Sequence, residues 1–315
     1  MVVIGAVLLG VAIAMRLLVG SDHFGLPETD KILDLRVQRA VMGIVVGAAL
    51  GVAGTLLQSL LRNPLASPDL LGLASGASLA VILATYIHHQ QTGERVIGAG
   101  VEGAALLGAM AALGAVYLLS QRRGLIDPVT MILIGVVIGI VCAAWTAFVQ
   151  QLMPDRGYAS GRWLLGQLDD NASWGRVQII GGVTLFGVLA GAFMGPWMDA
   201  ASMGEDEAHS VGVPLGRLRV TQFILAGALT AGAVTLAGPI GFVGLICPHA
   251  ARLLGGAGHR GVVIGSAVLG GALVVGADAL VKGVQFGTGR VPIGVLTAIV
   301  GGPVFIGLLW RERGR

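Results

Sequence analysis

The chain has 315 residues, of which 55% are hydrophobic and only 12% are charged, and its mean hydropathy is +0.85. Soluble domains carry about 25% charged residues, so this composition excludes an ordinary soluble enzyme. The net charge of +3 is too small to indicate binding to nucleic acid. Because the apolar runs lack the alternation of barrel strands, we predict an all-α membrane protein.

Nine apolar runs follow one another along the chain, and about 20 apolar residues are enough for a helix to cross a bilayer. They lie at residues 1–20, 40–61, 70–87, 96–120, 129–153, 177–198, 220–251, 261–281 and 291–310. The run 220–251 contains Gly238, Pro239 and Pro248, and proline removes a helical hydrogen bond. Dividing this run predicts ten transmembrane helices in one membrane domain, 1–315, with both termini on the same side.

A turn with two prolines follows the second run, in the segment Asn63-Pro64-Leu65-Ala66-Ser67-Pro68. Proline fixes φ and disfavours helix at the residue before it. We predict that Asn63, Pro64 and Pro68 shape a rigid turn and that the next helix begins near Gly72.

Glycine accounts for 52 of the 315 residues. Two sets recur every four residues: Gly43, Gly47 and Gly51, and Gly187, Gly191 and Gly195. Such ridges let another helix approach closely. We predict that they serve packing, either within the chain or across a dimer.

The segment from Met153 to Trp174 is too polar to span a membrane. Its two tryptophans, Trp163 and Trp174, are typical of a membrane interface. We predict a short helix at about 160–172 that lies on the outer surface.

The polar stretch 199–219 lies between two apolar runs and holds Glu205, Asp206, Glu207, His209, Arg217 and Arg219. Ser202 is able to cap a helix whose first turn carries the acids, where the helix dipole favours them. Gly212 and Pro214 would end that helix. We predict a short exposed helix that contacts a soluble partner, and the alternative is a loop that is only solvated.

Few other polar residues stand out. Asp278 and Glu102 fall near the ends of their runs. An ionisable group within a span is expected to have a functional role, and the alternative for these two is a solvated position at the membrane surface. Cys142 and Cys247 are interpreted as buried small hydrophobic residues. The adjacent pair His88-His89 does not face one ion on a helix, and we predict no metal site.

The chain has only two lysines, Lys31 and Lys282, and neither follows the Gly-x-x-x-x-Gly of a P-loop. We therefore predict that it is not an enzyme and that it binds no cofactor of its own. If transport is driven by ATP, separate ATPase subunits must bind ATP and Mg.

Four stretches resemble the FecCD family, the permease subunits of bacterial ABC importers for iron–siderophores, haem and vitamin B12. They are RVQRAVMGIVVGAALGVAGTLLQSLLRNPLASPDLLGLASGA at 36–77, RWLLGQL at 162–168, GPIGFVGLICPHAARLLGGAGHR at 238–260 and VPIGVLTAIVGGPVFIGLLW at 291–310. In the third stretch the motif residues are Gly238, Pro239, Gly241, Pro248, His249 and Arg252.

The resemblance implies the type II ABC importer permease fold, with ten transmembrane helices and both termini in the cytoplasm. It also implies the bacterial cytoplasmic (inner) membrane. The charges alone leave the orientation open, because lysine and arginine divide equally between the two sides of the predicted topology.

The partners of the family follow from the resemblance in the same way. The functional unit has two permease subunits, identical or paralogous, two cytoplasmic ATPases and an extracytoplasmic binding protein. The loop between the sixth and seventh helices docks on the ATPases. Here that coupling loop, 199–219, supplies Gly204, Glu205, Asp206, Glu207, His209, Ser210, Gly212 and Arg217.

The resemblance further implies that basic residues on the outer face meet acids of the binding protein. The matching positions are Arg36, Arg39 and Lys282, and charge pairs of this kind steer and orient association. Two residues depart from the pattern of the family, since Gln38 replaces a proline and Arg290 replaces a glutamate.

The sequence thus predicts a permease subunit that imports an iron–siderophore or related metal chelate, such as haem or a corrinoid, by alternating access. Its path would be largely apolar and lined partly by residues 131–149. The alternative is a secondary transporter or channel driven by an ion gradient, which would usually place acids at mid-membrane. The sequence leaves open which chelate is carried and whether the second permease is identical.

Overall fold

The computed structural model describes residues 2–20, 25, 29–93, 101–122, 125–153, 164–168, 172–256, 258–283 and 291–313. The helices in this part of the chain are α1 (Val2–Leu18), α2 (Asp30–Leu60), α3 (Leu73–Thr92), α4 (Val101–Leu119), α5 (Pro128–Gln151), α7 (Trp174–Met203), α8 (Glu205–Ser210), α9 (Leu215–Ala237), α10 (Val243–Leu253), α11 (Gly258–Gly283) and α12 (Ile293–Arg313). A short 3-10 helix, η1 (Pro68–Leu71), and a hairpin of β1 (Gln121–Arg122) and β2 (Leu125–Ile126) complete it.

Each predicted apolar run contains a helix, and the all-α prediction is confirmed. The run 220–251 does break at Gly238 and Pro239, because α9 ends at Ala237 and the short helix α10 begins at Val243. Among the described residues five helices are long and apolar enough to cross a membrane: α2, α5, α7, α9 and α11. That ten helices span remains a prediction.

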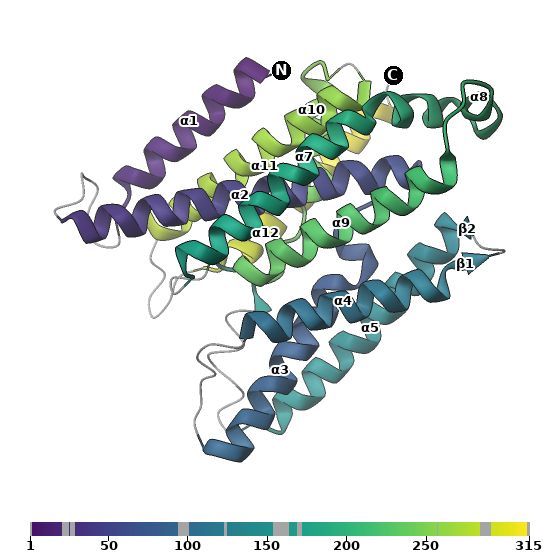
Figure 1. Ribbon diagram of the computed structural model, residues 1–315. Helices are drawn as coiled ribbons and strands as arrows, with labels where there is room; N and C mark the ends of the chain where they lie inside the picture. The colour runs from purple at the N-terminus through teal and green to yellow at the C-terminus, as the bar shows by residue number, and fades with distance from the viewer. Residues whose placement is uncertain are drawn as a thin grey trace.

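Helix α2 runs through the middle of the molecule and is buried along most of its length (Figure 1). Glycines let its neighbours come close: a Cβ placed on Gly47 would lie 2.0 Å from the carbonyl oxygen of Gly270 in α11. Likewise, a Cβ on Gly54 would lie 1.8 Å from the carbonyl oxygen of Gly244 in α10. The ridge of α2 thus packs within the chain, one of the two possibilities left open by its sequence.

Helices α3, α4 and α5 form a second group, drawn below α2 in Figure 1, with the β1–β2 hairpin between α4 and α5. Small apolar residues of α3 and α4 join this group to α9. The buried cluster that these three helices form consists of Ala74, Ala77, Val81, Ala105, Ala109, Ala231 and Val234.

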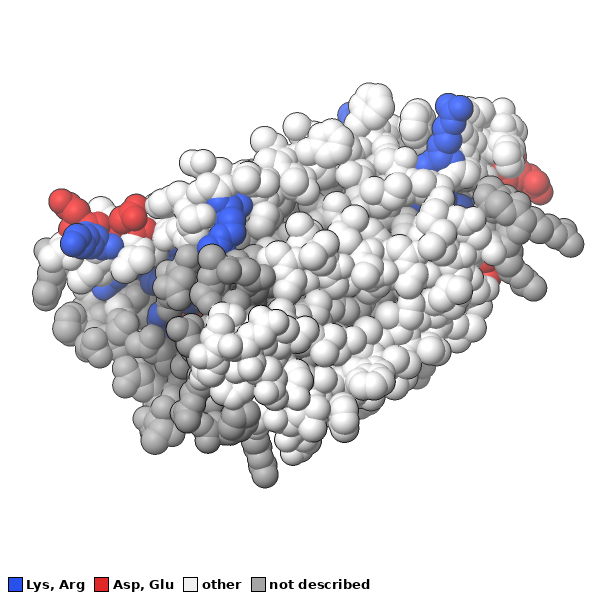
Figure 2. Space-filling model, turned by 60° about the horizontal axis from the view of Figure 1, so that its bottom comes forward, with Lys and Arg blue, Asp and Glu red and all other residues white. Residues whose placement is uncertain are grey.

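Charge is distributed unevenly over the surface. In Figure 2 the charged side chains lie toward the two ends of the visible face, and the area between them is almost free of charge. Figure 1 shows both termini at the top of the view. An uncharged belt between two polar ends is typical of a protein that spans a bilayer.

Two predictions lie wholly or mostly outside the described residues. The helix expected at about 160–172 includes residues 160–163 and 169–171, which the structure does not describe. The side chain of Glu102 also lies outside the description.

Candidate functional site

The polar stretch folds as a short helix, α8, set between α7 and α9. Gly204 separates it from α7 with φ 153° and ψ 164°, a conformation open almost only to glycine. This corrects the predicted start of the helix: Gly204 is the N-cap, whereas Ser202 belongs to α7 and its hydroxyl donates to the carbonyl of Asp199. Gly212, with φ 77°, follows the end of α8.

Helix α8 presents its polar side chains to the outside, while Ala208 within it and Val213 just after it are buried. The predicted coupling residues that lie exposed are Glu205, Asp206, Glu207, His209, Ser210, Gly212 and Arg217. Two apolar side chains beside them, Met203 and Val211, are 77% and 67% exposed. Acids and exposed apolar groups side by side form a surface suited to a partner with basic and apolar groups.

One ion pair fixes α8 to the start of α9. Arg219 donates to Glu205 at 2.5 Å, with the glutamate side chain 55% exposed. The hydrogen bond and the charge of Arg219 hold the pKa of Glu205 below its ordinary value of 4.5, and the more distant Arg62 acts in the same direction. Glu205 is therefore ionised at neutral pH, with Arg219 already partnered inside the chain.

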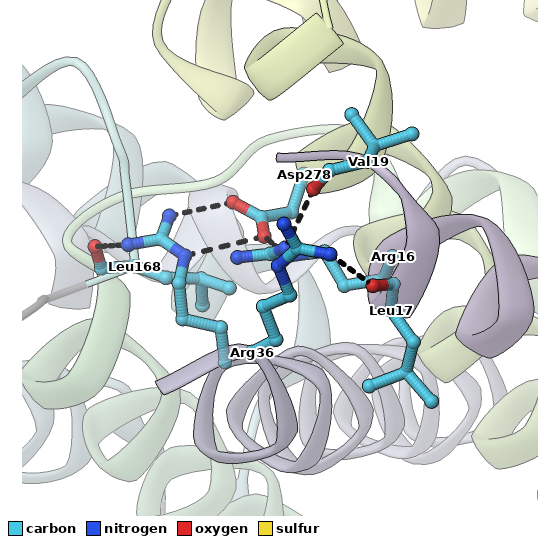
Figure 3. Close-up of polar contacts among 7 residues, drawn as sticks. Arg16, Leu17, Val19, Arg36, Leu168 and Asp278 are labelled. Carbon is cyan, nitrogen blue, oxygen red and sulfur yellow. Dashed lines mark hydrogen bonds and ion pairs between the residues drawn. The ribbon is translucent and has the colours of Figure 1, made fainter. Parts of the chain in front are cut away.

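A buried ion cluster lies where α1, α2 and α11 meet (Figure 3). Asp278 of α11 is 1% exposed and accepts hydrogen bonds from Arg16 at 2.5 Å and from Arg39 at 2.6 Å. The alternative that Asp278 is solvated at the membrane surface is therefore wrong. A carboxylate in this apolar setting is stable because two guanidinium groups compensate its charge.

Arg36 and Gln38 hold neighbouring backbone from the same part of α2. Arg36 donates to the carbonyl oxygens of Leu17 at 2.5 Å and of Gly25 at 2.8 Å. Gln38 donates to the carbonyl of Ala172 at 2.5 Å. Gln38, which departs from the pattern of the family, thus binds the segment that leads into α7.

The three predicted docking residues are placed differently. Arg36 and Arg39 are 8% and 7% exposed and bond within this chain, and Arg39 also donates to the carbonyl of Leu168. Lys282, at the end of α11, is half-buried. The structure therefore encloses both arginines, and docking by them stays a prediction that requires these bonds to be exchanged.

The proline turn and α10 come together against α2. Arg252 of α10 donates to the side chain of Gln58 at 2.5 Å, and Gln58 donates to the carbonyl of Ala66 at 3.3 Å. Pro68 lies against Gly244, where a Cβ would meet the proline ring at 2.6 Å. The two motifs, which are far apart in the sequence, are one structural unit.

Other motif residues shape the backbone of this unit. Asn63 accepts a hydrogen bond from the amide of Leu65 at 2.9 Å, while Pro64 is exposed at the turn. Gly238 ends α9 with φ 62°. The carbonyl of Pro239 lies so close to Gly166 that a Cβ there would approach it to 2.1 Å. Pro248 and His249 are buried inside α10.

Two polar residues of these clusters and turns were not predicted from the sequence. Arg16 was not singled out, although an acid in an apolar run calls for a counter-ion, and Arg16 is among the few basic residues within one. Asp69 was also missed. It lies in η1 beside Gly241, where a Cβ would be 3.6 Å from its carboxylate oxygen. Hydropathy averages over a run and does not report a single acid inside a turn.

Comparison with protein families finds one match along almost the whole chain: residues 1–311 match the FecCD transport family. Among curated relatives, the Cobalamin import system permease protein BtuC of Halobacterium salinarum is 35% identical over 293 residues, which cover 92% of this chain and 76% of that protein. The Fe(3+) dicitrate transport system permease protein FecC of Escherichia coli is 33% identical, with coverage of 96% and 89%.

A third relative and a solved structure are also similar. The Hemin transport system permease protein HmuU of Yersinia pestis is 32% identical and covers 89% of this chain and 83% of its own length. A solved inward-facing conformation of a metal-chelate type ABC transporter superposes with a TM-score of 0.83 at 26% identity, covering 97% of both chains.

Proposed function

This chain belongs to the FecCD transport family, and on that basis we propose that it is the transmembrane permease subunit of an ATP-driven ABC importer. Its curated relatives are permeases of import systems for cobalamin, haemin and ferric citrate. The cargo proposed here is accordingly an iron–siderophore or a related metal chelate. The observation that carries the proposal is the family match along almost the full length, together with the fold shared with a metal-chelate type transporter.

We propose that α8 is the element through which ATPase subunits act on the permease. Its acids form the surface described above together with the exposed Met203 at the end of α7 and Val211 just after α8. The pair Glu205–Arg219 passes a force on α8 directly to α9. Because this chain has no P-loop, the ATPases would bind ATP and Mg. A rigid short helix between two long ones is suited to transmit such movement.

The assembly proposed contains two permease subunits, identical or paralogous, two ATPases and an extracytoplasmic binding protein, in the bacterial inner membrane. The end of the bundle with α8 would face the cytoplasm, as would both termini. The ion-cluster end would then face outward, with Lys282 at the surface. Docking by Arg36 and Arg39 would require acids of the binding protein to replace the carbonyl and Asp278 contacts.

Purification tests the proposed coupling. The wild-type chain, expressed together with the ATPase encoded beside it, should retain that ATPase, and the double variant Glu205→Lys, Glu207→Lys should lose it. Asp30→Lys, an exposed acid at the far end of α2, serves as the matched control. Equal retention by all three proteins would overturn the role of α8, and uptake by vesicles without any ATPase would overturn the importer itself.

Binding measurements test the proposed docking. Replacing Lys282 by glutamate should weaken the affinity for the binding protein, because a charge that attracts becomes one that repels. An unchanged affinity for Lys282→Glu, and for Arg36→Glu with Arg39→Glu, would show that these residues do not take part.

A further inference from the structure

Asp69 lies deep inside the bundle and is nevertheless an exposed residue. It lies in η1, whose neighbours Ser67, Pro68 and Leu71 are all buried, yet Asp69 itself is exposed. Pro68 packs on Gly244, and Gly244 lies against the carbonyl of Leu50. Leu50 is ten residues before the end of α2, which at 1.5 Å per residue places η1 about 15 Å inside the end of the bundle that carries α8.

The contacts of η1 with α5 give the same depth. A Cβ on Gly135 would lie 2.3 Å from the carbonyl oxygen of Leu70. Gly135 is seven residues after the start of α5, about 10 Å into the helix. A carboxylate turned toward lipid at such a depth is strongly unfavourable, so the exposed side of Asp69 faces a space that admits water.

The carboxylate is held in place by neutral groups. The hydroxyl of Ser67 donates to Asp69 at 3.0 Å, and the backbone of Phe242, just before α10, also hydrogen-bonds to it. No ion pair joins Asp69 to any of the residues that the structure describes. Its negative charge is therefore not cancelled locally, in contrast to that of Asp278.

We propose that Asp69 lines the transport path and favours chelates that present cationic or hydrogen-bond-donating groups, against polyanionic chelates. The inference rests on the proposed importer function and adds a substrate class to it. An uncompensated charge in a confined space attracts opposite charge and repels like charge over several ångströms. A polyanionic ferric chelate would meet this repulsion where it passes η1.

A cysteine at Gly241 reports the local charge. Its Cβ would lie 3.6 Å from a carboxylate oxygen of Asp69. Apart from the adjoining residues, no other atom would lie within 4 Å, so the substitution fits. In the assembled permease–ATPase complex, with Cys142→Ala and Cys247→Ala, a cationic and an anionic methanethiosulfonate of similar size are compared. We expect the cationic reagent to react about tenfold faster.

Asp69→Asn separates the charge from a structural role, because asparagine keeps an acceptor for Ser67 and Phe242. The rate ratio should fall to about one in Asp69→Asn and stay unchanged in the control Asp30→Asn. The proposal is overturned if the ratio of the two labelling rates is unchanged in Asp69→Asn. It is also overturned if no reagent reaches the Gly241→Cys thiol in the complex. If Gly241→Cys does not assemble, Leu65→Cys, exposed in the same turn, takes its place.

Transport gives the second readout. In vesicles with the full complex and its binding protein, Asp69→Lys should lower uptake of a monocationic ferric trihydroxamate about tenfold more than uptake of a neutral one of similar size. Equal effects on both contradict the selectivity. If the wild-type complex takes up no chelate with ATP but the labelling rates still depend on Asp69, the importer function is contradicted. The claim that Asp69 carries a local negative charge is then still supported.

Discussion

At the scale of single residues, Asp278 joins three helices that are far apart in the sequence. Its two arginine partners come from α1 and α2, and all three side chains are enclosed. A buried ion pair adds little net stability compared with apolar packing, but breaking one is costly because a charge remains without its partner. The cluster therefore sets which arrangement of α1, α2 and α11 is allowed.

Asp278→Asn should lower the free energy of unfolding by about 3–5 kcal/mol, because two guanidinium groups then lie buried beside a neutral amide. Thermal unfolding in detergent would measure the effect. The control is Asp30→Asn, at an exposed position on α2. The free energy of unfolding of this variant should lie within about 0.5 kcal/mol of the wild-type value.

The triple variant Arg16→Met, Arg39→Met, Asp278→Leu should recover most of the stability lost by Asp278→Asn, because no charge remains buried. A triple variant no more stable than Asp278→Asn would show that packing, rather than charge compensation, explains the loss. Arg39 also bonds to the carbonyl of Leu168, so full recovery is not expected.

At the scale of elements, the crossing of α2 over α11 depends on glycine against glycine. A Cβ on Gly47 would lie 2.0 Å from the carbonyl oxygen of Gly270, and one on Gly270 would lie 2.1 Å from that of Gly47. Real Cβ atoms do not come so close to a carbonyl, so any side chain must push the two helices apart. The crossing also sets the distance across which Asp278 meets Arg39.

Gly47→Ala should destabilise the protein by about 1–3 kcal/mol through overpacking, although alanine favours helix over glycine by about 1 kcal/mol. Gly182→Ala in α7 is the matched control, because a Cβ there meets nothing within 4 Å and only the gain in helix propensity applies. The midpoint of thermal unfolding should fall for Gly47→Ala and hold or rise for Gly182→Ala. The reverse order would contradict the proposed crossing.

Local patterns predicted these elements well, and contacts between distant segments escaped them. Hydropathy located the apolar runs, and Pro239 marked the break between α9 and α10, because both depend on residues close in sequence. The pairing of Asp278 with Arg16 and Arg39 spans 262 and 239 residues, and no local pattern reports it. For the same reason the sequence placed Arg36 and Arg39 at an open surface, whereas the fold encloses them.

The candidate coupling segment was predictable for a physical reason. Charged residues between two long apolar runs have no place in the core, so α8 had to be exposed. Its cap was mispredicted because Ser202 fits a statistical preference, whereas the kink between α7 and α8 requires the conformation of Gly204. Turn geometry of this kind depends on how both flanking helices are held.

At the scale of the whole molecule, large apolar side chains lie exposed over the long helices. On α5 they include Leu133, Val137, Ile140, Trp145 and Phe148, and α7 carries Ile179, Phe186, Leu189 and Phe193. Exposed apolar area on this scale is unfavourable in water and favourable against lipid or a second permease. The protein is therefore complete only within a membrane.

Ile140→Arg tests this arrangement. The side chain of Ile140 is 64% exposed, so a soluble protein would tolerate arginine there, whereas a bilayer imposes about 2.5–3.5 kcal/mol at the centre of a spanning helix. The amount of folded protein in the membrane fraction should fall for Ile140→Arg. Val211→Arg, at an exposed position just after α8, should leave that amount unchanged, and a similar loss in both variants would count against the predicted belt.

The ion cluster also constrains how the chain is made. Arg16 and Arg39 belong to α1 and α2, which leave the ribosome long before α11, the helix that carries their carboxylate partner Asp278. Until α11 is synthesised, both guanidinium groups need water or lipid headgroups as partners. Helices α1 and α2 can therefore take their final places only after α11 has brought Asp278 to the two arginines.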